Sequence, residues 1–137
     1  MTVMTYKEMR TLTGLGQKEF AEKYNIPYRT YEKWERGENQ HADIVRPLLE
    51  RAVLEDSDPD FPKKPNILGF NMRRLLDFSH MTRKEISERY DIPYCSVKQW
   101  INGNAQPKTY IINLLERFIR EDTMNPWKEY INKKEGE

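Results

Sequence analysis

The sequence contains a single cysteine, Cys95, and only two histidines, His41 and His80, in 137 residues. One cysteine cannot form an intrachain disulfide, and two distant histidines do not have the spacing of zinc ligands. The sequence also lacks an apolar run long enough to span a membrane, a secretory leader and a lipidation motif. We therefore expect a reduced, cytoplasmic protein with no metal, no cofactor and no membrane partner.

A strong excess of one charge is missing as well. The chain has 23 Lys and Arg residues against 22 Asp and Glu residues, which gives a net charge of +1. Because proteins that bind nucleic acids usually carry a basic patch, a DNA-binding function would have to depend on where the charges lie. The sequence also lacks a phosphate-binding glycine loop and a nucleophile paired with a base at a familiar spacing. These absences predict that the protein is not an enzyme.

What the sequence does contain is an internal repeat. The segment EFAEKYNIPY at positions 19–28 returns as EISERYDIPY at positions 85–94, at an offset of 66 residues. The same offset places Trp34 on Trp100. Units of about 55 residues lie near the lower size limit for a core without metals or disulfides, so each copy should be small and helical. The predicted divisions are a first domain at 1–56, a linker at 57–66, a second domain at 67–122 and a tail at 123–137.

Local signals place the helices of the first repeat. Thr5 and Glu8 form a capping box that starts a first helix. The second helix should begin near Gly16 or Gln17 and end at Asn25, which suits positive φ. Pro27 then suits the opening of a third helix, where its missing N–H costs nothing.

The fourth helix is constrained by Pro47, because proline is tolerated in a first turn and disfavoured further inside. We therefore expect this helix to begin no earlier than about position 42 or 43, with Asp43 as its N-cap, and to run to about Leu54. Trp34 and Trp100 should both be buried. The predicted fold is all-α, with two tandem domains of four to five helices, a proline-containing linker and a short C-terminal helix.

The linker and the tail fall outside the repeat. Three prolines make the linker semi-rigid and extended, and Phe61 is placed to attach it to one domain. In the tail, three large side chains fall on one face of a short helix: Trp127, Tyr130 and Ile131. Such a face either packs back on the second domain or binds a partner protein.

Each repeat has a characteristic set of residues around a tight turn between two helices. In the first repeat these are Leu15, Gly16, Gln17, Glu19, Phe20, Ala21, Tyr24, Ile26, Tyr31, Trp34, Glu35, Arg36 and Gly37. In the second repeat they are Met81, Thr82, Arg83, Glu85, Ile86, Ser87, Tyr90, Ile92, Val97, Trp100, Asn102 and Gly103. On these residues, each repeat resembles the phage repressor and Cro-like family of helix-turn-helix DNA-binding domains.

The resemblance implies that the third helix of each repeat lies in the major groove of duplex DNA, while the start of the second helix contacts a phosphate. The implied DNA-binding residues of the first repeat are Gln17, Tyr28, Arg29, Thr30 and Lys33. Those of the second repeat are Arg83, Tyr94, Cys95, Ser96, Lys98 and Gln99. Of these, Arg29 is suited to guanine and Gln99 to adenine, while Cys95 or Ser96 could lie against a thymine methyl. The implied function is a transcriptional repressor, of bacterial, phage or mobile-element origin, that occupies an operator.

Several alternatives stay open at this point. A charged helix face can simply be solvated, and Glu32, Glu35 and Glu38 would repel phosphate. Tyr28 and Tyr94 suit either phosphate contact or packing over the turn. The implied DNA-binding residues of the two repeats differ. One chain would therefore recognise an asymmetric operator, unless it forms a homodimer.

A second functional hypothesis is a protein-binding module of the antitoxin or phage-encoded inhibitor type. In that case a helical face or the aromatic tail would bind another protein. Near-neutral charge favours this hypothesis, since it weakens the electrostatic attraction to DNA.

Overall fold

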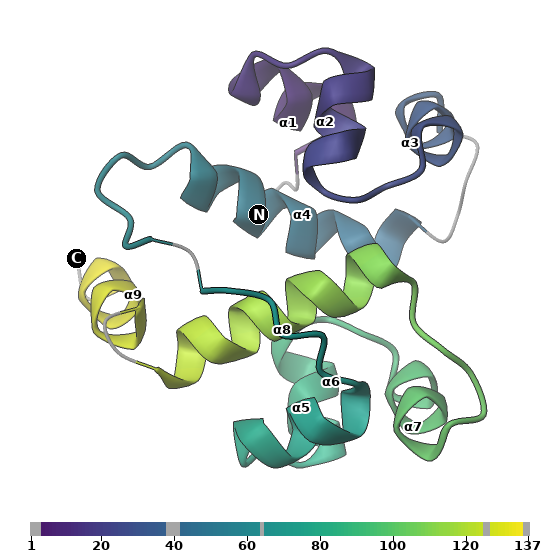
Figure 1. The fold of residues 1–137 in the computed structure, drawn as a ribbon, viewed down its shortest axis with the longest axis vertical. Coiled ribbons are helices and arrows are strands. Elements are labelled where there is room, and N and C mark those ends of the chain that lie inside the picture. Colours follow the sequence, from purple (N-terminus) through teal and green to yellow (C-terminus); the bar gives the residue numbers. More distant parts are fainter. Residues whose placement is uncertain (1–3, 38–41, 64, 125–126, 136–137) are drawn as a thin grey trace. The chain divides into compact units, whose positions relative to one another are not determined.

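Every regular element is a helix within residues 4–37, 42–63, 65–124 and 127–135, which the computed structural model describes (Figure 1). The all-α prediction is therefore confirmed. None of the described helices combines the length and the apolar character needed to cross a bilayer. The helices are α1 (Tyr6–Thr13), α2 (Gln17–Lys23), α3 (Tyr28–Glu35), α4 (Ala42–Asp56), α5 (Met72–Ser79), α6 (Arg83–Arg89), α7 (Tyr94–Asn102), α8 (Thr109–Thr123) and α9 (Trp127–Glu135).

The chain forms two compact units, Met1–Asp58 and Pro59–Glu137. The first contains α1 to α4, and the second contains α5 to α9. The point of division lies inside the segment 57–66 and assigns most of that segment to the second unit.

The helix starts and stops follow local sequence signals. The Thr5 hydroxyl accepts from the Glu8 N–H and the Glu8 carboxylate accepts from the Thr5 N–H, which confirms the predicted capping box. Thr82 and Glu85 form the same pair before α6. The stop after α5 is at His80, whose φ of 59° is in the left-handed region.

Helix α4 begins at Ala42, which confirms its predicted start, but it differs from the prediction at Pro47 and Asp43. Pro47 lies more than one turn inside the helix, and Asp43 is a helical residue, not an N-cap. A proline at this place cannot donate to the carbonyl four residues earlier. Burial of Val45, Leu48 and Leu49 on either side of it offsets this loss, because tertiary packing outweighs local propensity.

Each unit has its own apolar core. In the first unit the buried side chains include Met9, Phe20, Ile26, Tyr31, Trp34, Leu49 and Val53; in the second they include Met72, Leu75, Ile86, Ile92, Val97, Leu115 and Phe118. The expectation for Trp34 is confirmed, whereas Trp100 is only half-buried. Ile101, one residue further along α7, is buried instead. Trp34 packs on the Tyr6 ring, with 5.2 Å between centroids, and the residue equivalent to Tyr6 in the second unit is Met72.

Candidate nucleic-acid interface

The turn before α3 and the turn before α7 have the same backbone geometry. Asn25 and Asp91 have φ values of 60° and 55°, so both turns pass through the left-handed region. The next residue, Ile26 or Ile92, is buried and donates its N–H to a carbonyl of the preceding helix, at 2.9 and 3.0 Å. A buried isoleucine and a hydrogen-bonded turn therefore fix the start of the third helix similarly in both units.

A second repeated contact ties the helix before this turn to the last helix of the four. The Tyr24 hydroxyl donates to Asp56 at 2.7 Å, and the Tyr90 hydroxyl donates to Asp122 at the same distance. A cation also pairs with each carboxylate: Lys23 with Asp56 at 3.7 Å and Arg89 with Asp122 at 3.1 Å. These contacts attach α2 to α4 and α6 to α8, and so support the turn that follows α2 and the turn that follows α6. We call each Tyr to Asp hydrogen bond a brace.

Four of the residues predicted for DNA binding share the outer surface of α3, and we call them the α3 face: Tyr28, Arg29, Thr30 and Lys33. All four are solvent-accessible, and Tyr28 exposes 38% of its surface. Arg29 and Lys33 are four residues apart, so they project from the same side of the helix. This partial exposure of Tyr28 is compatible both with a phosphate contact and with packing over the turn.

The fifth predicted residue, Gln17, belongs to a polar cluster at the start of α2. Its amide nitrogen donates to the Glu35 carboxylate at 3.1 Å. Arg10 donates to both oxygens of the same carboxylate, at 2.7 and 3.2 Å. An amide nitrogen carries two hydrogens, so the bond to Glu35 orients Gln17 and still allows a second donation.

Glu35 is therefore a paired carboxylate, not an isolated negative charge next to the α3 face. Burial by itself would raise the pKa of Glu35, but hydrogen bonds led by the one from Arg10 outweigh it and lower the pKa below the ordinary 4.5. Its side chain is only 8% exposed. The repulsion of phosphate expected from Glu35 is consequently reduced by a neighbouring guanidinium, while Glu38 lies outside the described residues.

The corresponding surface of α7 we call the α7 face: Tyr94, Cys95, Ser96, Lys98 and Gln99. Tyr94 exposes 44% of its surface, and the Cys95 thiol, Lys98 and Gln99 are also exposed, whereas Ser96 is half-buried. The Lys98 ammonium lies 5.6 Å from the centroid of the Tyr94 ring, one helical turn away. Helix α7 contains no Asp or Glu, so this face presents one cation with uncharged polar groups.

The two units differ around the start of α2 and α6, the first helices of the two pairs. Positions equivalent to Arg10 and Glu35 hold Leu76 and Ile101, so the second unit has no counterpart of that ion pair. Arg83 occupies the place of Gln17 as the first residue of α6 and is half-buried. The structure thus brings the predicted residues together as two sets, one in each unit, whose chemistry is different.

Sequence reasoning did not predict the hydrogen bonds that support these faces. The Tyr24 to Asp56 bond joins residues 32 positions apart, and no local motif announces such a pair. The available signal was the repeat itself, because Tyr24 and Asp56 both return 66 residues later as Tyr90 and Asp122. Identical polar residues at equivalent positions of two copies are candidates for a shared hydrogen bond.

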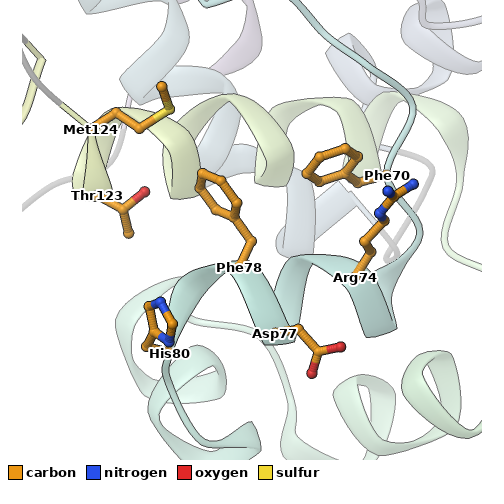
Figure 2. A pocket seen from close by; sticks show the side chains of 7 residues that line it. All are labelled: Phe70, Arg74, Asp77, Phe78, His80, Thr123 and Met124. Carbon is orange, nitrogen blue, oxygen red and sulfur yellow. The ribbon is translucent and has the colours of Figure 1, made fainter.

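A shallow groove in the second unit is a separate surface feature (Figure 2). Its lining residues are Phe70, Arg74, Asp77, Phe78, His80, Thr123 and Met124. The Phe70 and Phe78 rings meet edge to face, with centroids 6.0 Å apart, and the Arg74 guanidinium lies over Phe70 at 5.0 Å. Asp77 and His80 do not point toward each other in Figure 2, so the groove does not assemble an acid-base pair.

No cluster of three or more His, Cys, Asp or Glu side chains suited to a metal ion occurs in the part of the chain that the structure describes. Comparisons of the chain with protein-family models, with curated proteins and with solved structures find no match. The α3 and α7 faces and the contacts that support them are therefore the features that bear on function.

Proposed function

We propose that the protein binds duplex DNA sequence-specifically, with α3 and α7 as the recognition helices of two helix-turn-helix units. One observation carries the proposal: two helix pairs with the same turn geometry and the same Tyr to Asp brace display exposed polar faces. Rigid support combined with a variable exposed face is what base recognition requires, since side chains must reach base edges from a fixed helix.

The chemistry of the two faces supports different base preferences. Arg29 can donate two hydrogen bonds to guanine, and Lys33, one turn further, can reach the next base or a phosphate. Gln99 can bind adenine through two hydrogen bonds, and Cys95 can contact the methyl group of thymine. A single chain would then recognise two dissimilar half-sites, whereas a homodimer would recognise a palindrome.

The biological role that fits these features is a repressor that occupies an operator and so excludes the polymerase. With a net charge of +1, the protein gains little from non-specific attraction to the DNA backbone. Its affinity for an operator would have to come from direct contacts at the two faces.

Salt dependence tests this proposal against its main alternative. Phosphate neutralisation releases counterions, so the affinity for a selected duplex should fall steeply as salt rises. The variant Lys33→Ala should bind more weakly and show a salt slope smaller by about one. Lys7→Ala is the matched control, because Lys7 is exposed on α1 and its loss changes the charge equally. Binding that is indifferent to salt and equal for both variants would refute DNA recognition.

The second candidate is a protein-binding module, favoured by the low net charge and by the aromatic face of α9. Trp127, Tyr130 and Ile131 are all half-buried, so each keeps part of its surface accessible. An interface of this kind depends on apolar burial and would respond weakly to salt. A partner bound through α9 would be lost on changing Ile131 to Asp, while Lys33→Ala would have no effect.

A further inference from the structure

The segment that joins the two units is attached along much of its length to the second unit. The Phe61 ring meets the Tyr130 ring of α9 edge to face, with 5.3 Å between centroids. The Trp127 indole N–H donates to the carbonyl of Lys63 at 2.7 Å. Both contacts come from α9, so this helix holds the linker where it enters the second unit.

The attachment continues beyond α9 toward α5. Arg120 on α8 donates to the carbonyl of Asn66 at 3.0 Å. The Glu116 carboxylate, whose residue is only 1% exposed, accepts from the N–H groups of Leu68 and Phe70 at 2.7 and 2.9 Å. Contacts to α8 and α9 therefore hold the described residues of 61–63 and 65–70 at several points.

The other end of the linker is held by α4. Ser57 and Asp58 donate their N–H groups to carbonyls of Val53 and Glu55, at 3.0 and 3.1 Å. Two residues, at positions 59 and 60, separate this end from Phe61. Two extended residues reach about 7 Å, which leaves a short tether between the fastened ends.

Release of the α9 contacts would lengthen this tether considerably. The next anchor would be Asn66, so that residues 59–65 would be able to extend. Seven extended residues reach about 24 Å, roughly 17 Å more than two. At about 3.4 Å per base pair, this extra reach corresponds to about five base pairs, or half a turn of DNA.

We infer that α9 is a spacer clamp, which keeps the tether short and thereby limits the separation of the two half-sites that one chain can occupy. The inference rests on the proposed function, since it concerns how two DNA-binding units share one operator. Helix α9 is not required to complete the repeated set of helices, because α1 to α4 close the first core and α5 to α8 are their counterparts. An offset of 66 residues places Trp127 on Phe61. The described residues that follow Phe61 up to position 69 are not helical, so the first repeat has no equivalent of α9.

Two variants test the clamp from its two sides. Phe61→Ala removes the linker ring and leaves α9 intact, while Tyr130→Ala removes the α9 ring. Lys128→Ala is the control, because Lys128 is exposed on the same helix. The first readout is the rate at which trypsin cleaves the bond after Lys63, whose carbonyl accepts from Trp127. We expect cleavage about tenfold faster in both variants and unchanged in the control, because loss of an aromatic pair favours local opening.

The second readout is the affinity of the full chain for duplexes in which the spacing of the two selected half-sites changes by one base pair at a time. The wild type and Lys128→Ala should prefer one spacing sharply. Phe61→Ala and Tyr130→Ala should accept spacings up to about two base pairs longer, because Trp127 still holds Lys63 and only residues 59–62 are free to extend. Faster cleavage with an unchanged spacing preference would overturn the inference and leave the proposed function intact. Unchanged cleavage would show that α9 does not hold the linker and would also overturn it. Failure of the wild type to bind any duplex would instead refute the proposed function.

Discussion

At the scale of single residues, Glu35 links the stability of the first unit to pH. Its folded-state pKa is lowered, so its contribution to the free energy of unfolding is present above about pH 4.5 and is lost as the pH falls through the folded pKa. We expect protection of α2 and α3 amides from hydrogen exchange to decline below about pH 4.5 in the wild type.

In the variant Glu35→Gln this acid-dependent decline should be smaller, because the group that titrates is gone. Protection at neutral pH should also be lower, since Arg10 loses its charged partner. Glu22→Gln is the control, as Glu22 is exposed on α2. Identical pH profiles for the wild type and Glu35→Gln would contradict the assignment.

The repeated Tyr to Asp bonds give a second prediction for single residues. Tyr24→Phe and Tyr90→Phe should each lower the free energy of unfolding of their unit by about 1.5 to 3 kcal/mol, because each hydroxyl donates to a carboxylate. Tyr28→Phe should change little, since that side chain is exposed. The comparison can be made by hydrogen exchange of core amides, and equal protection in all three variants would show that the brace is unimportant.

Helix caps could be predicted from the sequence, whereas these braces could not. A capping box such as Thr5 with Glu8 depends on residues three positions apart and is complete within one turn. The Tyr24 to Asp56 bond exists only after α2 has packed on α4. Local chemistry therefore predicts the first kind of contact, and only tertiary structure creates the second.

At the scale of helices, α4 shows where local rules are insufficient. A rule based on backbone donors disfavours proline beyond the first turn, but Pro47 lies further inside α4, where apolar side chains on both sides of it are buried. The helix thus continues through a residue that costs it a hydrogen bond. Burial of the α4 face compensates for this cost.

This interpretation predicts that Pro47→Ala stabilises the first unit by about 1 to 3 kcal/mol, since alanine restores a donor and removes a steric clash. The equivalent change in α8, Asn113→Ala, should have a smaller effect because asparagine already has an N–H. Denaturant unfolding followed by helical circular dichroism would compare the two. A loss of stability in Pro47→Ala would show that the proline is favourable where it lies.

At the scale of the whole molecule, the small size of the repeated units and their local helix signals predicted the all-helical structure, but not how the copies diverge. Trp34 is buried against the Tyr6 ring, whereas Trp100 is half-buried and the position equivalent to Tyr6 holds Met72. The contacts of α9 with Phe61 and Lys63 join segments over 60 residues apart and have no counterpart in the repeat. Comparing the two copies shows which residues differ, but not how those differences change packing.

The central claim is that two unlike faces in one chain recognise DNA. The most direct measurement is selection of binding sites from a random duplex library, carried out in parallel with the wild type, Arg29→Ala and Gln99→Ala. We predict a motif with two dissimilar halves from the wild type. Arg29→Ala should lose preference in one half, at a cost of about 1 to 3 kcal/mol, and Gln99→Ala should lose it in the other. Failure to enrich any motif, or one that is the same in all three proteins, would contradict the claim.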